Sequence, residues 1–402
     1  SRTKIFLEDF GNSFYEADKL IVTDIYAANE KAIQGIDGQH VCNVVKRSGH
    51  QNVSYVPRAQ LAEAMRHELR PGDLMITVGA GDVYKAANEI SHGLKAKTAD
   101  PIRKSKSKGM FSSIRGRVRQ EESLSKHTSL KVGGPIRYWV EPEDLSDLQE
   151  VIRISSQKRK RIYLFGLGSN ILAPDKGLDG VGICLGSAYF KDIRLEGQRV
   201  AARAGAPNTR LIQFGLENGY GGFECLQGVP GSVGGSIVMN AGSHEESIDF
   251  YLRELVVLDR KGNLNVLSKA EAAFGYRSSN LGSVIVVEGL FEFPKKDRQS
   301  VMQILDSHKE HRSKTQDLWH ASAGCMFKNP KNSGASSGQL IDKAGLKGER
   351  VGQAQISNKH ANFIINLGGA TATDVRLLIE HAKRCVREKF NVSLETEVKI
   401  LA

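Results

Sequence analysis

A glycine-rich stretch near the middle of the chain limits the fold and the chemistry more than any other segment. It reads Gly228-Val-Pro-Gly-Ser-Val-Gly-Gly-Ser-Ile-Val-Met-Asn240 and lies between apolar flanks. Glycine permits positive φ and lets the backbone approach a ligand closely. Free N–H groups in such a turn form an anion site, and a helix that starts near Val233 would add its dipole. The stretch predicts a phosphate or pyrophosphate site, with a tight turn that binds no ligand as the alternative.

A second loop of the same chemistry lies upstream. It reads Phe165-Gly-Leu-Gly-Ser-Asn170 and follows an apolar, strand-like run over residues 162–165. Two separated phosphate-binding loops suit a dinucleotide ligand better than they suit a single phosphate. We therefore favour a dinucleotide ligand over a bare turn at both places.

Composition narrows the class of protein. The 402 residues suffice for two or three domains, and 40% hydrophobic with 25% charged residues is typical of a globular chain. The sequence contains no run of eighteen apolar residues, so no membrane span is predicted, and the first residues lack a signal-peptide pattern. Five cysteines without a CxxC pair favour a reducing cytoplasm over disulfides or a zinc site. We expect no metal site.

The net charge of +11 raises the question of nucleic-acid binding. Much of the clustering lies in one run, Arg103-Lys-Ser-Lys-Ser-Lys108, followed by three further arginines up to Arg119. No aromatic residues are interleaved there, so a solvated linker over residues 95–122 is favoured over a binding arm. Binding of small anionic ligands explains the positive charge equally well.

Residues 1–94 predict a small Rossmann-like α/β domain. Strands are expected over 20–26, 53–56 and 74–78, and helices over 4–17, 58–69 and 82–94. The first strand is apolar nearly throughout, as buried parallel strands are. The segment Gly79-Ala-Gly-Asp-Val-Tyr84 is not a full GxGxxG motif and indicates only a strand-to-helix turn.

This segment resembles the carboxy-terminal domain of UDP-N-acetylmuramate–L-alanine ligase. The resemblance lies in Arg2-Thr3, Asp24-Ile-Tyr-Ala-Ala-Asn-Glu30 and Gly79-Ala-Gly81. It implies a domain that closes over an amino acid, with Tyr26 and Glu30 as contacts. The chain has no GxxxxGK[ST] motif to cradle ATP. Either the chain is a fragment of a longer fusion, or this domain has only a structural role.

From residue 123 the pattern predicts an α+β layout. Short strands are expected over 138–140, 162–165, 181–185, 200–204, 255–258 and 284–287, and helices over 145–155 and 208–218. Residues 123–402 resemble the UDP-N-acetylenolpyruvoylglucosamine reductase family, flavoproteins of peptidoglycan synthesis. The resemblance rests on both glycine loops and on Asn240-Ala-Gly242, Phe274-Gly-Tyr-Arg277, Ser322-Ala-Gly-Cys-Met-Phe-Lys-Asn-Pro330, Leu340-Ile-Asp342 and Leu394-Glu-Thr-Glu-Val398.

The resemblance implies an FAD-binding domain over 123–293 and a substrate-binding domain over 294–402 that ends in a catalytic strand. The short interval from Arg277 to Cys325 suggests the shorter of two subtypes. FAD would be bound by Gly166, Gly168, Ser169, Asn170, Gly231, Ser232, Gly234, Gly235 and Asn240. The implied reaction takes hydride from NADPH to FAD, and then from FAD to the enolpyruvyl ether of UDP-N-acetylglucosamine enolpyruvate. The product is UDP-N-acetylmuramate.

Three residues match the catalytic positions of the family. Arg277 can grip a carboxylate by two hydrogen bonds and stabilise developing negative charge. Cys325 matches a proton donor that is commonly serine, and a thiol with an ordinary pKa of about 8.5 is the better acid. Glu397 would orient or polarise the carboxylate, whereas Glu395, on the same face of a terminal strand, is expected to be solvated. The alternatives are a surface arginine, a structural cysteine and a solvated acid.

Weaker candidates are Tyr276, Lys328 and Asn329 as substrate contacts. His308 and His311 share a helix face but have no third ligand nearby in the sequence. Two other functions stay open: another FAD-dependent oxidoreductase, which keeps the loops but not the three catalytic residues, and a nucleic-acid or scaffold protein that uses the basic linker. The sequence therefore favours a cytoplasmic enzyme without nucleic-acid or membrane partners.

Overall fold

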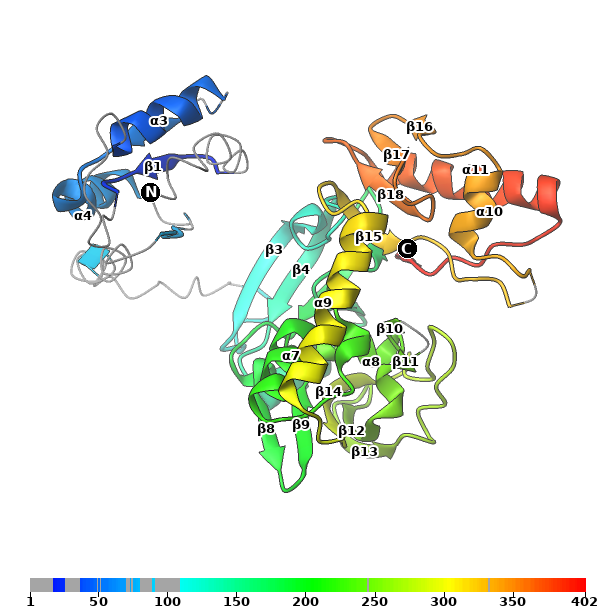
Figure 1. Cartoon of the computed structure of the whole chain (residues 1–402). Coiled ribbons are helices and arrows are strands. Elements are labelled where there is room, and N and C mark those ends of the chain that lie inside the picture. Colours follow the sequence, from blue (N-terminus) through cyan, green and yellow to red (C-terminus); the bar gives the residue numbers. More distant parts are fainter. Residues whose placement is uncertain are drawn as a thin grey trace. The chain divides into compact units, whose positions relative to one another are not determined.

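The computed structural model describes residues 17–25, 37–48, 50, 52–69, 73, 75–79, 89–90, 109–243, 246–331 and 333–402. The chain divides into two compact units, residues 1–105 and 106–402 (Figure 1). Within the described residues, no helix is both long enough and apolar enough to cross a bilayer.

The first unit contains a pair of parallel strands, β1 (Leu20–Val22) and β2 (Val53–Tyr55), as the sequence predicted for these two strands. Helix α4 (Arg58–Glu68) is also confirmed. Helix α3 (Gly38–Arg47), which the sequence analysis missed, packs its apolar face on β1 and β2. Residues 75–78 form no strand, contrary to prediction, and the side chains of Ile76 and Val78 are exposed. The proposed contacts Tyr26 and Glu30, and most of the expected helices over 4–17 and 82–94, lie outside the described residues.

The second unit begins with a four-stranded sheet in the order β3-β4-β7-β5. Its strands are β3 (Arg117–Ser123), β4 (Pro135–Glu141), β5 (Arg161–Phe165) and β7 (Leu178–Cys184), and α6 (Leu145–Gln157) packs beside β5. Strand β3 corrects the predicted linker over 95–122. Its sequence RVRQEES is polar, but antiparallel pairing with β4 orders it. Phe111, also assigned to the linker, is fully buried.

The second sheet has the order β13-β12-β14-β9-β8 and is antiparallel throughout. Its strands are β8 (Ile193–Glu196), β9 (Arg199–Arg203), β12 (Leu252–Leu258), β13 (Leu264–Ser268) and β14 (Ile285–Phe291). Its core also takes side chains from α7 (Asn208–Glu217), α8 (Val233–Val238) and α9 (Arg298–Thr315). Because Val301 and Leu305 of α9 lie in this core, α9 packs with the first half of the unit, although the predicted boundary at residue 293 assigned it to the second.

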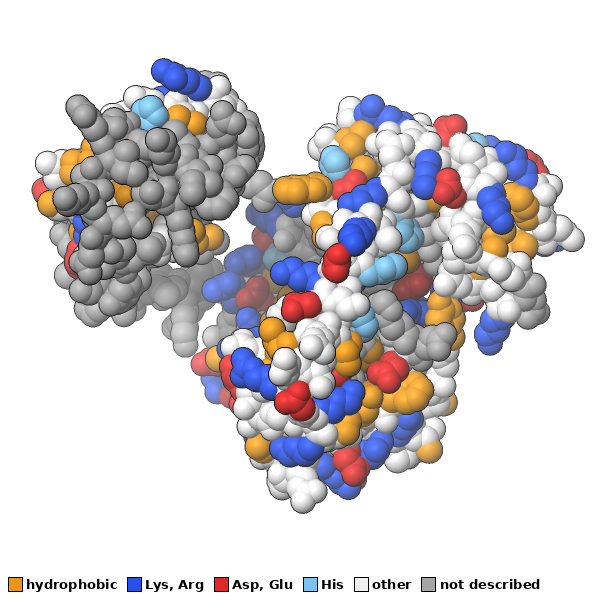
Figure 2. Space-filling model, in the orientation of Figure 1, with side chains coloured by type: hydrophobic (Ala, Val, Ile, Leu, Met, Phe, Trp, Pro, Cys, Tyr) orange, Lys and Arg blue, Asp and Glu red, His pale blue; other side chains and the backbone are white. Residues whose placement is uncertain are grey.

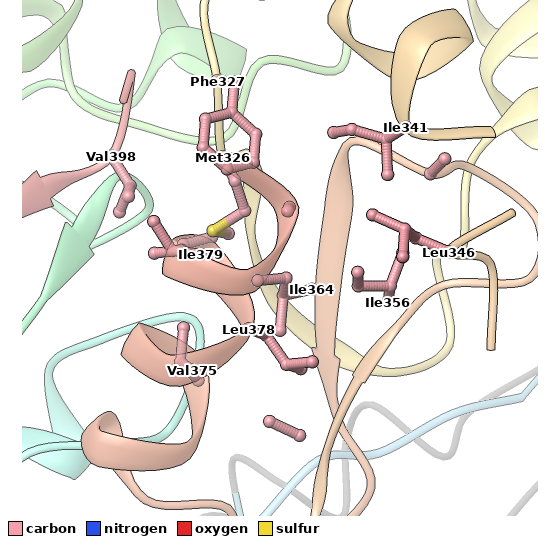
Figure 3. Packing of buried hydrophobic residues seen from close by; sticks show 14 of the residues in the cluster. Met326, Phe327, Ile341, Leu346, Ile356, Ile364, Val375, Leu378, Ile379 and Val398 are labelled. Atoms are coloured by element: carbon pink, nitrogen blue, oxygen red, sulfur yellow. The ribbon is translucent and has the colours of Figure 1, made fainter. Parts of the chain in front are cut away.

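The third sheet has the order β15-β18-β17-β16 and is also antiparallel. It consists of β15 (Ala321–Cys325), β16 (Arg350–Val351), β17 (Ala354–Ile356) and β18 (Phe363–Asn366), with α10 (Ser337–Lys343) and α11 (Ala372–Phe390). Figure 3 shows the shared core, in which Met326 and Phe327 lie with Ile379 and Val398. Leu130, from the connection between β3 and β4, and Leu172 of β6 join this core.

Short elements complete the second unit. They are β6 (Ile171–Leu172), β10 (Gly242–Ser243), β11 (Glu246–Ser247), β19 (Lys399–Ile400), and 3-10 turns at Leu124–Lys126, Tyr189–Lys191, Glu224–Leu226 and Ile248–Phe250. The parallel pairing of β19 with β6 places the end of the chain directly beside the first glycine loop. In Figure 2, lysine and arginine side chains of this unit are interspersed with aspartate and glutamate on the visible face.

Candidate active site

The two glycine-rich loops lie against each other. The Ser169 hydroxyl donates a hydrogen bond to the carbonyl of Pro230. A Cβ atom added to Gly166 would lie 2.7 Å from the Ser232 hydroxyl oxygen, and one added to Gly231 would lie 3.6 Å from that of Ser169. Segments about sixty residues apart in the sequence therefore form a single backbone surface.

The first loop offers open backbone donors. Within the described part of the chain, the amides of residues 166–170 donate no hydrogen bond. Gly168 has φ +67° and lies so close to the neighbouring turn that a Cβ atom would come within 1.9 Å of the His127 carbonyl oxygen. Its own carbonyl accepts from the Ser129 amide at 3.1 Å. Five successive free amides on a fixed loop are suited to an anion such as a pyrophosphate.

In the second loop, part of the backbone is hydrogen-bonded within the protein. Helix α8 starts at Val233, as expected, and Ser232 caps it. However, the amides of Val233 and Gly234 donate to Ala206 and Ala204 at 2.8 and 2.9 Å, and that of Gly235 donates to the Ser232 hydroxyl at 3.4 Å. The amides at the start of α8 therefore make hydrogen bonds within the protein, and these bonds join α8 to the residues that follow β9. The amides of Gly231 and Ser232 donate no hydrogen bond to another described residue.

The close approach at Gly168 gives a test. We expect Gly168→Ala to destabilise the protein by about 2–5 kcal/mol, from the left-handed φ and from the collision with His127, and to lose bound flavin. Gly197→Ala is the matched control, because Gly197 has φ +64° but nothing within 4 Å of an added Cβ. It should cost only about 1–2 kcal/mol and keep the flavin. Urea unfolding and the ratio of flavin to protein absorbance measure both; equal behaviour of the two variants would contradict this assignment.

Arg277 is held by backbone carbonyls beside the second loop. Its guanidinium donates to the carbonyls of Asn240, at 3.3 Å, and Gly242. The Asn240 side chain, predicted as a cofactor contact, donates to the Gly275 carbonyl at 3.0 Å and so fixes the turn before Arg277. Arg277 itself has φ 51°, an uncommon conformation for a residue other than glycine. A strained backbone of this kind occurs often at functional sites.

Glu397 lies opposite Arg277, with Oε1 3.6 Å from the Arg277 Nε. The C-terminal segment that carries it is hydrogen-bonded to both halves of the unit. Its amide donates to the Met326 carbonyl at 2.8 Å, and its carbonyl accepts from the Asn170 side chain at 3.2 Å. Burial raises the pKa of Glu397, and Arg277 opposes that rise, with help from Lys328. As expected, Glu395 is exposed, and it pairs with Lys328 at 2.7 Å.

Cys325 ends β15 at a β-bulge and pairs with Phe363. Burial, together with the charge of Glu397, raises the pKa of the Cys325 thiol to about 12, although Arg277 and Arg312 pull it down. The thiol is therefore protonated at neutral pH and can act as an acid. The buried Asn362 side chain holds Phe327, two residues after Cys325, by bonds of 2.9 and 2.8 Å to its amide and carbonyl.

Tyr276, Lys328 and Asn329 line one pocket of about 600 Å³ beside this centre. Lys331, Ser333, Ser393 and Glu395 also line it, so charged and polar side chains border the pocket. The Asn329 carboxamide oxygen accepts from the Ser337 amide at 3.1 Å and so fixes the start of α10. The pocket joins the turn that carries Arg277 to the segment that follows Cys325.

The structure adds residues that the sequence analysis did not single out. Asn362 orders the segment after Cys325, and Ser129 donates to the Ser322 carbonyl at 2.6 Å and so fixes β15 near the first loop. Both act on positions far away in the sequence, so no local motif indicates them. In the described part of the chain, no group of three His, Cys, Asp or Glu side chains could hold a metal ion.

Comparison with known proteins matches the two halves of the second unit to two family models. Residues 136–268 match an FAD binding domain, and residues 315–401 match the C-terminal domain of UDP-N-acetylenolpyruvoylglucosamine reductase. The reductase of Desulforamulus reducens is 40% identical over 290 residues, which is 72% of this chain and 95% of that protein. The reductase of Halalkalibacterium halodurans is 40% identical over 71% of this chain and 95% of its own length.

A solved structure agrees with these matches. The crystal structure of UDP-N-acetylenolpyruvylglucosamine reductase from Thermus caldophilus superposes with a TM-score of 0.63 and 33% identity, over 71% of this chain and all of that one. The fold that the sequence predicted for the second unit is thereby confirmed. The chain belongs to the UDP-N-acetylenolpyruvoylglucosamine reductase family.

Proposed function

We infer that the chain catalyses the NADPH-dependent reduction of UDP-N-acetylglucosamine enolpyruvate to UDP-N-acetylmuramate through FAD, in peptidoglycan synthesis. One observation supports this most strongly: Arg277, Glu397 and Cys325 come together from three segments beside the junction of the glycine loops. A flavin oxidoreductase for another substrate would need the loops but not this constellation.

The residues present fit FAD. The open amides of 166–170, with those of Gly231 and Ser232, provide donors for a pyrophosphate, and Gly166 and Gly168 leave no room for side chains that would block the approach. When bound, FAD supplies the hydride chemistry, for which no protein side chain is suited.

The chain's own residues supply the other requirements of the reaction. As hydride reaches carbon 3 of the enolpyruvyl group, negative charge builds at carbon 2 and on its carboxylate. We propose that Arg277 stabilises this charge and that Glu397 orients the Arg277 guanidinium. Cys325 gives the proton to carbon 2, because its thiol stays protonated at neutral pH. The neighbouring pocket would bind the nucleotide part of the substrate through Tyr276, Lys328 and Asn329.

Steady-state oxidation of NADPH tests the proposal. We expect oxidation that depends on UDP-N-acetylglucosamine enolpyruvate, and no stimulation by UDP-N-acetylglucosamine, which lacks the alkene. Equal oxidation with both compounds, or with neither, would refute the substrate assignment.

We propose three further points. The domains are residues 123–293 for FAD and 294–402 for substrate, with the qualification that α9 packs on the first. Residues 1–94 derive from the carboxy-terminal domain of UDP-N-acetylmuramate–L-alanine ligase, and the parallel β1–β2 pair with α3 between them is compatible with that origin. All five cysteines are free thiols in the structure, in keeping with a cytoplasmic site of action.

A further inference from the structure

The pocket beside the candidate active site carries charges of both signs. Lys328 and Lys331 line it, and among its described lining residues Glu395 is the only acid. The Lys328 ammonium donates to the Glu395 carboxylate, with Nζ 2.7 Å from Oε1. The proposed function assigns the nucleotide part of the substrate to this pocket, so a carboxylate lies where a diphosphate has to bind. The two anions repel each other at short range.

The two partners of this ion pair differ in burial. The Lys328 side chain is 14% exposed, whereas that of Glu395 is 72% exposed. Because the carboxylate is already in contact with water, turning it away from the lysine costs little, and a pair of this kind is weak. The lysine is largely desolvated and therefore needs an anionic partner. Lys328 can thus exchange the carboxylate for another anion at a small cost in free energy.

The backbone holds Lys328 in place without the Glu395 carboxylate. The Lys328 amide donates to the Glu395 carbonyl at 2.9 Å, and the Lys328 carbonyl accepts from the Ser337 hydroxyl. One residue earlier, Phe327 forms a β-bridge with Thr396. Among the described residues, the Glu395 carboxylate bonds to Lys328 alone. Loss of that carboxylate should therefore leave the lysine beside the pocket.

We propose that Glu395 competes with the diphosphate of the nucleotide for Lys328 and so sets the affinity of the pocket. The inference rests on the proposed binding of the nucleotide part of the substrate in this pocket. Binding exchanges one ion pair for another: the Lys328 ammonium leaves the carboxylate and pairs with a phosphate oxygen, while the Glu395 carboxylate turns toward water. Substrate and product carry the same diphosphate, so this competition weakens the binding of both and favours release of the product.

Titration of the flavin-bound protein with UDP at low ionic strength tests the proposal. We expect Glu395→Gln to bind UDP about threefold to tenfold more tightly than the wild type, because both the competing ion pair and the repulsion of the diphosphate are lost. A gain in affinity separates this role from a structural one, since a damaged pocket would bind UDP more weakly.

Glu380→Gln is the matched control. Glu380 is 61% exposed and pairs with Lys383 at 3.0 Å, so the variant also removes an exposed carboxylate from a lysine. It lies on α11 about three turns before Asn391, the C-cap residue that lines the pocket. The UDP affinity of this variant should stay within about twofold of the wild type.

A second pair of variants tests whether the competition acts through Lys328. In a Lys328→Gln background, adding Glu395→Gln should change the UDP affinity by less than about twofold, because the ammonium for which the anions compete is gone. A gain there as large as in the wild-type background would overturn the proposal, since it would show general repulsion only.

Unchanged or weaker UDP binding in Glu395→Gln would also overturn the proposal, as would a complete lack of UDP binding in all the variants. The titration needs neither NADPH nor turnover. Tighter UDP binding by a Glu395→Gln protein whose wild type does not reduce the enolpyruvyl substrate would therefore support this inference and refute the proposed reaction.

Discussion

Replacing Cys325 with alanine is expected to slow the reduction of the enolpyruvyl substrate by about 10²–10⁴-fold, the usual contribution of a positioned acid. Reduction of the flavin by NADPH should continue at the wild-type rate, because that step needs no proton from the thiol. Cys325→Ser should retain substantial turnover, since a hydroxyl can donate from the same position. Burial and Glu397 already bring the thiol pKa to about 12, which reduces the difference in acidity between thiol and alcohol.

Stopped-flow measurement of the two half-reactions separates these effects. Cys385→Ala is the control, because Cys385 lies on α11 at the edge of the core of the third sheet and is not one of the candidate active-site residues. It should behave as the wild type in both steps. An alanine variant at Cys325 with an unimpaired second step would remove this thiol from the mechanism.

Arg277→Gln is expected to slow the same second step by about 10²–10³-fold, because it removes a fixed donor at the point where charge develops. The loss should appear in kcat rather than in KM alone, since the interaction strengthens in the transition state. Arg277→Lys should recover part of the rate but not all of it, because an ammonium cannot reach both the Asn240 and Gly242 carbonyls in the forked geometry.

The same variant should change the pH dependence. Burial raises the pKa of Glu397, and Arg277 is the main group that lowers it. Without Arg277 the folded-state pKa rises further, so the carboxylate is lost at a higher pH as the solution is made more acidic. The acid limb of the second half-reaction should therefore move to higher pH. Arg253→Gln removes a surface arginine of β12 that pairs with Glu292, and it should leave the pH profile unchanged. An equal shift of the acid limb in Arg253→Gln would contradict the assignment.

Local patterns in the sequence sufficed for much of this account. The apolar runs over 162–165 and 200–204 and the helix over 208–218 are where expected, because burial and periodicity are written into neighbouring residues. The start of α8 at Val233 was also predictable, since Ser232 is a good N-cap. Strand β3 was not, because its order comes from pairing with β4 and not from its own polar residues.

For the candidate site, local motifs named candidate residues but not the hydrogen bonds that those residues make. Asn240 and Asn170 were predicted as cofactor contacts, and in the structure their side chains also hold the turn before Arg277 and the segment of Glu397. Likewise, the amides of Val233 and Gly234 donate hydrogen bonds to the carbonyls of Ala206 and Ala204, which follow β9. Each of these bonds joins segments distant in the sequence, so no motif could reveal which donors remain open for a ligand.

The most direct test of the central claim is an anaerobic two-step experiment on the purified, flavin-bound chain. NADPH is added first, and UDP-N-acetylglucosamine enolpyruvate second, while flavin absorbance is followed. The account predicts that the flavin colour bleaches with NADPH and returns with the enolpyruvyl substrate, in one-to-one proportion to UDP-N-acetylmuramate formed. A protein that binds no FAD, or whose reduced flavin is not reoxidised by this substrate, would contradict it.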